Sequence, residues 1–374
     1  MKRFIFDQLV SAENICNLAR EKAAIERHIV NRDRVVIYAP RNFGKTSLIK
    51  NVVIPEFRSK NNPSFTLFAD LMEVRDMDSL VARLQNAFER SFADSFPIRN
   101  LVENIKRFLS GLKPDITVDP VTSQTGISLK IAPGSKEYSI SFLFHLIKQI
   151  AAKAPVLVAL DEFQDVVKVN EAQAMFRQAF EDLGDVPIIV MGSQKHILSD
   201  IFSKPHAPLA FWGNDLPFQP IAYQEYHDYI QERFDQRELK IDPDCSKYLQ
   251  DLLWRIPEPI NVVSHQIYST YQKKEVKKEH INLAIAELLE NKKSRYETHL
   301  AGFSAAEEKV CMNLARLNYI EKPQSKEFVS ACQVTSRTVG KIFRKFRNKG
   351  IIEKTDSGYR LSDPLLKSFF NIYR

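Results

Sequence analysis

The stretch that most constrains the fold of this chain is VVIYAPRNFGKTSLIK, residues 35–50. An apolar, β-branched run is followed by a short turn and then by Gly44, Lys45 and Thr46 at the start of a helical pattern. This is the order that a phosphate-binding loop requires. In such a loop, backbone N–H groups and a helix N-terminus surround an anion, a lysine neutralises the terminal phosphates and a threonine hydroxyl ligates magnesium.

The stretch therefore predicts a Walker A motif, with one departure from the usual pattern. Ala39 stands where the first glycine is usual, a position that mainly starts the turn, so the change is mild. An ordinary strand-to-helix turn containing Gly-Lys-Thr is the alternative interpretation. The residues predicted to surround ATP are Ala39, Pro40, Arg41, Asn42, Phe43, Gly44, Lys45, Thr46 and Ser47.

A second motif, VLVALDEFQD, occupies residues 156–165. Its five apolar residues suit a strand that is buried on both faces of a parallel sheet, and two carboxylates follow at the strand end. We expect Asp161, together with Thr46, to hold Mg²⁺, because this hard cation prefers oxygen ligands. Glu162 is expected to polarise the attacking water as general base. An apolar run followed by Asp-Glu is common by itself, but downstream of the first motif it predicts a Walker B motif.

Two further segments supply candidates for the same site. The strand predicted at residues 186–194 ends in polar residues. In P-loop ATPases a polar residue at this strand end senses the γ-phosphate. Ser193 is the first candidate for this role and Gln194 is the second. Residues 13–30 read as a helix before the first strand, and Arg20 with its neighbours Ala19 and Glu21 becomes a candidate contact for the base. The alternative for the strand end is a polar turn without a role in the site, and the alternative for residues 13–30 is a surface helix.

Length and composition indicate a protein of two or three domains. A chain of 374 residues is too long for one compact core. No apolar run approaches the roughly 18–20 residues of a membrane span, and the N-terminal apolar patch is too short for a secretory signal, so we expect a cytoplasmic protein with no membrane partner. Cys16, Cys245, Cys311 and Cys332 lie far apart and are expected to be buried thiols.

The pattern divides the chain into three predicted domains. Residues 1–221 hold the two motifs, with a β-hairpin insertion near residues 115–132. Residues 222–300 carry only helical patterns and are expected to form an all-α lid. Residues 301–374 read as three helices and two short strands around a turn, the order of a winged-helix domain.

The positive charge of the chain is concentrated in the last of these domains. Residues 301–374 hold fourteen Lys and Arg against seven Asp and Glu, whereas residues 1–300 hold thirty-nine of each. The third helix of this domain, predicted at residues 336–349, has six basic residues and no acidic one. Because phosphate contacts dominate affinity for DNA, we expect double-stranded DNA to bind there, with a protein-contacting basic face as the alternative. The predicted contacts are Arg337, Lys341, Arg344 and Lys345.

Together these segments resemble the archaeal-type ATPase family, a prokaryotic branch close to the AAA+ and STAND ATPases. The resemblance rests on NLAREKAAIE, VVIYAPRNFGKTSL, LDEFQDV and the VMGSQ strand, and it spans nearly the whole chain. It implies an α/β fold, in which an AAA+-like P-loop NTPase parallel sheet is sandwiched by helices and followed by an all-α lid and a winged helix. It also implies ATP and Mg²⁺ as cofactors and hydrolysis of ATP to ADP.

Two departures from this family affect what the resemblance implies. The family often has a PLxGR-like element, and here PLAFWGND offers Asn214 where the arginine would stand. Of the lid element GxP only Pro257 is kept, which we expect to contact the nucleotide; the nearby Arg255 is a candidate replacement for the missing positive charge. The alternatives to a switch ATPase are a nucleotide-dependent regulator that hardly hydrolyses ATP and a STAND-like module that binds a protein partner or itself.

Overall fold

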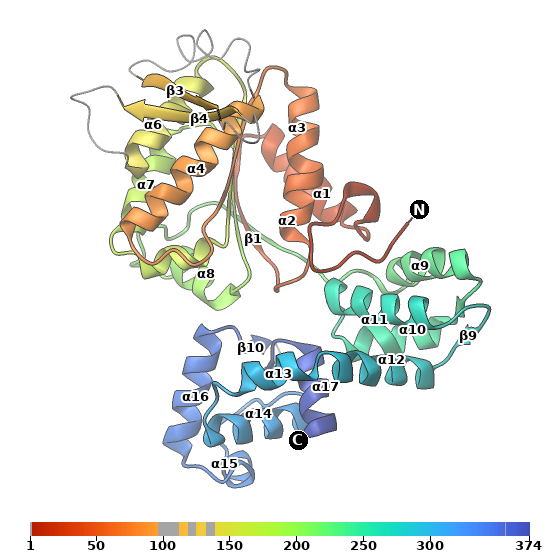
Figure 1. Ribbon diagram of the computed structural model, residues 1–374. Coiled ribbons are helices and arrows are strands. Elements are labelled where there is room, and N and C mark those ends of the chain that lie inside the picture. Colours follow the sequence, from red (N-terminus) through yellow and green to blue (C-terminus); the bar gives the residue numbers. More distant parts are fainter. Residues whose placement is uncertain (1, 96–111, 119–124, 132–138, 356) are drawn as a thin grey trace. The chain divides into compact units, whose positions relative to one another are not determined.

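The computed structural model describes residues 2–95, 112–118, 125–131, 139–355 and 357–374 (Figure 1). The chain divides into two compact units. One is Leu9–Gln219, called here the P-loop unit, and the other combines Met1–Gln8 with Pro220–Arg374, called the C-terminal unit. The finer division into three domains stays a prediction.

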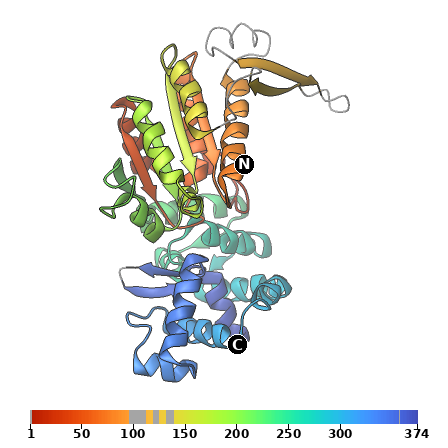
Figure 2. The same ribbon diagram turned by 90° about the vertical axis from the view of Figure 1, so that its left-hand side faces the viewer.

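The P-loop unit is built on a five-stranded sheet with the order β2-β5-β6-β1-β7. Every neighbouring pair in it is parallel, and Figure 2 shows the strands side by side between helices. The three central strands are almost entirely buried because apolar residues occupy both of their faces. The strands are β1 (Arg34–Tyr38), β2 (Phe65–Asp70), β5 (Val156–Asp161), β6 (Ile188–Gly192) and β7 (Asn214–Pro217).

Helices cover both faces of this sheet, so the predicted α/β architecture is confirmed (Figure 1). On one face lie α1 (Ala19–Val30), α2 (Lys45–Leu48), a π-helical turn (Ile49–Val53) and α3 (Ile54–Lys60), the last three being continuous. On the other face lie α4 (Met77–Ser95), α6 (Ile140–Ala151), α7 (Ala172–Asp182) and α8 (Lys195–Phe202). The apolar core of the unit forms between this second group and the sheet.

One predicted helix start was wrong for a local reason. The helix expected over residues 13–30 begins only at Ala19, whose N–H is taken by the side chain of Asn17 at 3.2 Å. A similar bond ends β2 at Asp70, because the Asp70 carboxylate accepts the N–H of Met72 and starts a turn.

A β-hairpin overlaps the predicted insertion near residues 115–132. Strand β3 (Leu112–Val118) pairs antiparallel with β4 (Thr125–Ile131), and β3 begins three residues before the predicted start. The residues between them, 119–124, lie outside the described part of the chain.

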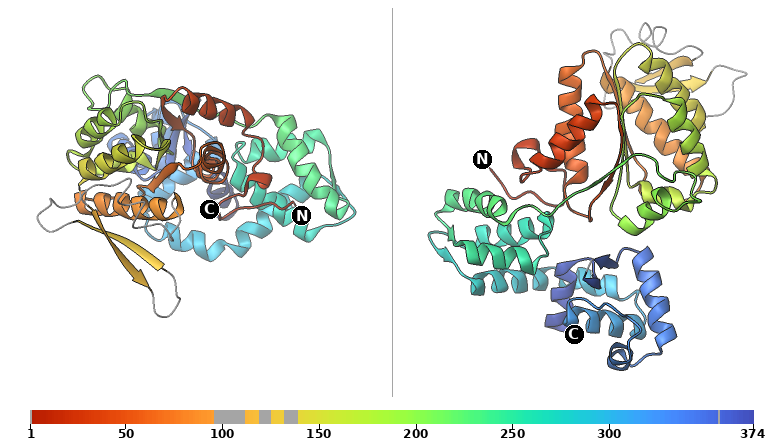
Figure 3. Two further views of the ribbon diagram at one scale, coloured as in Figure 1. Left: turned by 90° about the horizontal axis from the view of Figure 1, so that it is seen from above. Right: turned by 180° about the vertical axis from the view of Figure 1, so that it is seen from behind.

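The C-terminal unit begins with four helices, as expected for residues 222–300. They are α9 (Tyr223–Phe234), α10 (Pro243–Leu252), α11 (Pro257–Thr270) and α12 (Lys278–Asn291), with a short parallel pair, β8 (Lys240–Ile241) and β9 (Glu275–Val276), and a further helix, α13 (Lys293–Leu300). The predicted order of three helices and a hairpin follows (Figure 3). It comprises α14 (Ala305–Leu317), α15 (Lys326–Cys332), α16 (Ser336–Asn348), β10 (Ile352–Thr355) and β11 (Gly358–Leu361), and the chain ends with α17 (Pro364–Tyr373).

The first residues of the chain pack within the C-terminal unit, although the sequence-based division placed them with the P-loop region. Phe4 is buried, and its ring meets three aromatic rings edge-on. The ring centroids are 5.7 Å away for Phe234, 6.1 Å for Tyr229 and 6.3 Å for Tyr268. The N-terminal segment is therefore part of the apolar core of this unit.

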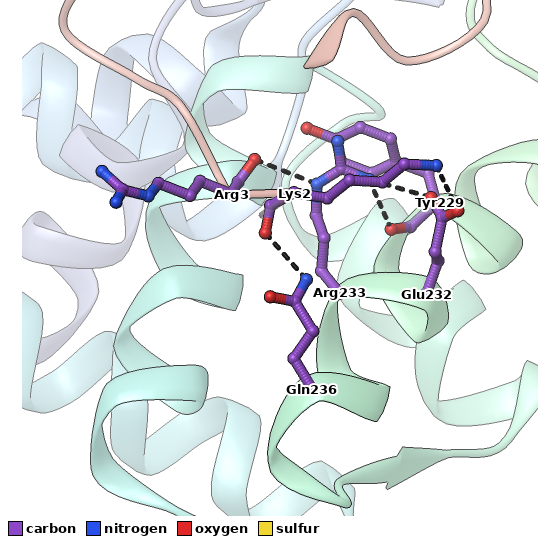
Figure 4. A network of polar contacts seen from close by, with 6 residues as sticks. All are labelled: Lys2, Arg3, Tyr229, Glu232, Arg233 and Gln236. Carbon is purple, nitrogen blue, oxygen red and sulfur yellow. Dashed lines mark hydrogen bonds and ion pairs between the residues drawn. The ribbon is translucent and has the colours of Figure 1, made fainter. Parts of the chain in front are cut away.

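A fully buried arginine secures the same segment (Figure 4). The guanidinium of Arg233 lies 3.4 Å above the ring of Tyr229, and its Nε donates to the carbonyl of Arg3 at 3.0 Å. Gln236 donates to the carbonyl of Lys2 at 2.8 Å. Because α9 and the 3-10 turn that follows it (Asp235–Arg237) thus satisfy backbone carbonyls of the segment, residues 2–4 are held in one register.

Two expectations from composition can be compared with the structure. All four cysteines are buried and free, as expected. Among the described residues, no helix is both long and apolar enough to cross a membrane.

Candidate functional site

The predicted phosphate-binding loop joins β1 to α2. Asn42 and Gly44 lie in the left-handed region of backbone space, with φ of 63° and 88°. Glycine adopts this conformation without strain, which explains why Gly44 precedes the helix. The helix then continues from Lys45 to Lys60 through α2, the π-helical turn and α3, so its N-terminus faces the loop and favours a bound anion.

Lys45 lies buried inside the loop. Its ammonium group donates to the carbonyls of Ala39 and Pro40, both at 3.0 Å. Burial lowers the pKa of Lys45, while the carboxylates of Glu162 and Asp161 act to raise it. The loop thus holds a cation beside two carboxylates, the charge arrangement that a phosphate and a divalent cation need.

The two predicted magnesium ligands are in contact with each other. Thr46 Oγ1 donates to Asp161 Oδ2 at 2.5 Å. Burial raises the pKa of Asp161, although the Thr46 hydroxyl and Lys45 favour its charged form. A hydroxyl and a carboxylate are hard oxygen donors that fit Mg²⁺, and this ion commonly takes its remaining ligands from phosphates and water. Among the described residues, no group of three or more His, Cys, Asp or Glu side chains fits a metal ion.

Glu162 and Ser193 are also brought together, from the carboxyl ends of the neighbouring strands β5 and β6. Ser193 Oγ donates to Glu162 Oε2 at 3.1 Å. Glu162 itself has a left-handed φ of 50°, which turns the chain sharply after the strand. Parallel strands end at one edge of their sheet, where α/β proteins place their ligands, so this contact puts the predicted base at the expected edge.

The start of α1 lies beside the loop. A Cβ atom added to Gly44 would stand 3.6 Å from Leu18 Cδ1, so the residue before α1 contacts the loop. Arg20 is exposed, whereas Glu21 is buried and accepts the N–H of Gln219 at 3.3 Å. Of this segment, Arg20 keeps its side chain available for a ligand and Glu21 has a structural bond.

Ser47 has a bond of its own within the fold. Its buried hydroxyl accepts the N–H of Val10 at 3.0 Å, and Asn51 donates to the Val10 carbonyl at 2.7 Å. The N–H of Ser47 at the helix start, rather than its side chain, is therefore the group that suits a phosphate.

Of the three residues compared with the family pattern, one belongs to the P-loop unit and two belong to the C-terminal unit. Asn214 opens β7 opposite Val35, at the amino ends of the strands, and so at the edge of the sheet opposite the loop. Arg255 belongs to the C-terminal unit, where its guanidinium donates to the carbonyl of Pro220 and lies 4.2 Å from the ring of Tyr223. Pro257 is the first residue of α11 in the same unit.

One residue of the site was missed from the sequence. Gln164 is 1% exposed, and its Nε2 donates to Glu162 Oε2, the oxygen that Ser193 also contacts. The stretch around it, Phe163-Gln164-Asp165, mixes apolar, polar and charged residues and carries no signal of the group that the amide meets.

The basic helix α16 has the two faces that the sequence predicted. Its apolar side is buried, whereas Arg337, Lys341 and Arg344 are exposed. Lys345 is exposed as well, and its ammonium group pairs with the buried carboxylate of Glu307 on α14 at 2.6 Å. Spacings of three and four residues place Arg337, Lys341 and Arg344 on one side of the helix.

Comparisons with known proteins identify the fold. No family model matches the sequence, and no curated protein matches it. Among solved structures, the Walker-type ATPase PABY2304 of Pyrococcus abyssi is similar, with 16% identity, a TM-score of 0.63 and 99% of each chain covered. The Aeropyrum pernix ORC2 protein, solved as ADPNP-ADP complexes, has 13% identity and a TM-score of 0.51 over 99% of this chain and 98% of its own. The Aeropyrum pernix ORC1 protein, solved in complex with DNA, has 13% identity, a TM-score of 0.50 and the same coverage.

The similarity to these three structures covers 99% of this chain and is a similarity of fold. They confirm the predicted fold class, an AAA+-like P-loop parallel sheet with helices on both faces, followed by a helical C-terminal region. The resemblance to the archaeal-type ATPase family stays a prediction.

Proposed function

We propose that this protein is a switch ATPase that binds ATP with Mg²⁺ in the loop of residues 39–47 and hydrolyses it to ADP and phosphate. The observation that carries the proposal is the pair of contacts at one sheet edge, Thr46 to Asp161 and Ser193 to Glu162. They join residues from three separate segments of the chain, each of which was predicted for the same chemistry. An ordinary strand-to-helix turn gives no reason for these contacts.

Each residue has a role that follows from its position. Lys45 neutralises the β- and γ-phosphates, moving its ammonium group from the loop carbonyls to the stronger acceptor. Thr46 and Asp161 hold Mg²⁺, which supplies charge stabilisation for the transferred phosphoryl group. Glu162 orients and deprotonates the attacking water, and Ser193, bonded to the same carboxylate, is placed to respond to the γ-phosphate. Arg20 and Pro257 stay candidate contacts for the nucleotide.

Two substitutions separate binding from hydrolysis. Lys45→Ala is expected to weaken ATP binding, measured by equilibrium titration, because a buried cation is lost from the loop. Glu162→Gln is expected to keep ATP affinity and to lower turnover by about 100-fold or more, the usual contribution of a general base. Native turnover that neither substitution changes would overturn the proposal. Tight ATP binding with no turnover in the native protein would instead favour the nucleotide-dependent regulator.

We further propose that α16, read as the recognition helix of a winged helix, binds double-stranded DNA through Arg337, Lys341 and Arg344. The support is their exposure on one side of a helix with no acidic residue, together with the net positive charge of residues 301–374. The ORC1 protein of the same fold was solved in complex with DNA. A cytoplasmic location stays an expectation from the sequence.

The dependence of DNA binding on salt tests this second proposal. Each phosphate contact contributes about 0.9 to the slope of the logarithm of affinity against the logarithm of salt concentration, so charge reversal at the three positions should remove most of the slope. Arg295→Glu, at an exposed position on α13, has the same change in net charge as Arg344→Glu and is the matched control for that single reversal. If the native protein shows no steep slope, or if the control weakens binding as much, the basic face serves a protein partner or self-association instead.

A further inference from the structure

Two hydrogen-bond donors converge on a single oxygen of Glu162. Gln164 Nε2 and Ser193 Oγ both donate to Oε2, and the Ser193 bond measures 3.1 Å. Neither bond uses Oε1, the second oxygen of the same carboxylate. The side chain of Glu162 is therefore held at one oxygen, while the other oxygen stays available to accept a proton.

The amide of Gln164 is fixed by a glycine on the next strand. A Cβ atom added to Gly192 would stand 2.0 Å from Gln164 Oε1 and 2.9 Å from Leu198 Cδ1. Neither distance is compatible with ordinary packing, so the amide occupies the space that any other residue at position 192 would fill. Gly192 has no left-handed backbone that would require glycine, which makes the close approach of Gln164 the reason for this residue.

The amide oxygen of Gln164, Oε1, lies in an unfavourable environment. Gln164 Oε1 is buried and makes no hydrogen bond, a state that destabilises the fold because the desolvated oxygen has no donor. A methionine of similar length would fill this space without that cost. The net benefit of a glutamine at this position must therefore come from its Nε2, the atom that binds Glu162.

We propose that Gln164 is a positioning residue for Glu162: its amide, packed on Gly192, holds Oε2 so that Oε1 faces the attacking water. This inference rests on the proposed ATP hydrolysis and adds a residue that acts through Glu162 without touching the nucleotide. Positioning matters because a displacement of a catalytic group by about 1 Å can lower the rate 100-fold.

The first experiment replaces Gln164 with methionine and measures kcat, KM and equilibrium ATP affinity. We expect kcat to fall at least about 10-fold while KM and ATP affinity change less than about 2-fold, because only a step after binding needs the orientation of Glu162. The matched control is Gln250→Met in the C-terminal unit. Gln250 is also 1% exposed, donates through Nε2 and has an unpaired buried Oε1, so it reports the effect of losing such an amide away from the site.

Two further variants test whether Gln164 acts through Glu162. Gly192→Ala displaces the amide without changing any polar group, and we expect a loss of kcat similar to that of Gln164→Met. In a Glu162→Gln background, Gln164→Met should change the residual turnover less than about 2-fold, since the group that it positions is already gone. A further loss of turnover in that background, or native kcat in Gln164→Met, would overturn the inference while leaving the proposed hydrolysis intact.

A crystal structure tests whether Gln164 positions Glu162 without any measurement of turnover. If the native protein shows no hydrolysis that depends on Glu162, the proposed function fails, and a crystal structure of Gln164→Met then tests the positioning itself. The expected result is a Glu162 carboxylate that has rotated away from Ser193. A carboxylate in its native place, with the Ser193 bond kept, would show that Gln164 does not position it.

Discussion

Replacing Phe4 with alanine tests whether the N-terminal segment is a structural part of the C-terminal unit. Phe4 is 6% exposed and meets the rings of Tyr229, Phe234 and Tyr268. The Phe4→Ala substitution removes all three ring contacts and leaves a gap in the core. The backbone bond from Arg233 to the Arg3 carbonyl is not removed directly, so the substitution reports on packing.

The expected loss of stability follows from burial and from chain position. Removing a buried phenylalanine from a rigid core costs about 3–5 kcal/mol. A short segment that packs along the edge of a core can instead detach, and each residue that detaches regains about 1–2 kcal/mol of conformational entropy, which limits the measured loss. We therefore expect the C-terminal unit to lose about 2–3 kcal/mol, or roughly 5–10 °C in thermal midpoint.

Trypsin cleavage and thermal unfolding give the two readouts. In the native protein the Arg3 carbonyl is bonded to Arg233, so trypsin should cleave slowly after Lys2 and Arg3. In Phe4→Ala, mass spectrometry should show that cleavage at these two positions is at least about 10-fold faster. Phe6→Ala is the matched control, because Phe6 is only partly buried and meets one ring, that of His265. Native cleavage rates and an unchanged midpoint in Phe4→Ala would refute the assignment of this segment to the core.

Two other predictions concern the same unit. Gly358 has a φ of 129°, and a Cβ atom at this position would stand 2.6 Å from the carbonyl oxygen of Ile320. Gly358→Ala should therefore lower the free energy of unfolding, measured by urea titration, by about 2 kcal/mol or more. A loss below about 0.5 kcal/mol would contradict this prediction. Burial raises the pKa of Glu258, and the carboxylates of Asp7 and Asp363 raise it further. A raised carboxyl pKa gives stability that is present in acid and is lost as the pH rises through that pKa. Glu258→Gln should therefore raise the thermal midpoint relative to the native protein at pH 8 but not at pH 4, and an equal shift at both pH values would exclude the mechanism.

Local order in the sequence was sufficient to predict the loop and the strand that meet in the site. Gly44, Lys45 and Thr46 follow an apolar run directly, and Asp161 and Glu162 follow another. Parallel strands buried on both faces align their carboxyl ends, so the two segments had to meet once both were strands of one sheet. The contact between Thr46 and Asp161 is therefore a consequence of patterns that are visible in the chain.

Contacts that depend on packing could not be predicted in this way. Gln164 reaches Glu162 because Gly192 leaves it space on the neighbouring strand, and this depends on the register of β5 against β6. Lys345 is one of the exposed cations of α16, and its ion pair with the buried Glu307 comes from the packing of this helix. In both cases the partner lies on another element, and nothing in the local pattern indicates which side chain it is.

The sequence by itself determined the strand–loop–helix order, the pair of motifs and the amphipathic basic helix, because each is encoded in residues that are close together in the chain. Only the tertiary structure decided where the N-terminal segment belongs. Phe4 and Arg233 are some 230 residues apart, and their association comes from burial of apolar and aromatic surface, which has no period and no spacing that a sequence can display. The predicted phosphate-binding loop was therefore readable at once, whereas the side chain that contacts Glu162 and the segment that completes the second unit became visible only in the folded chain.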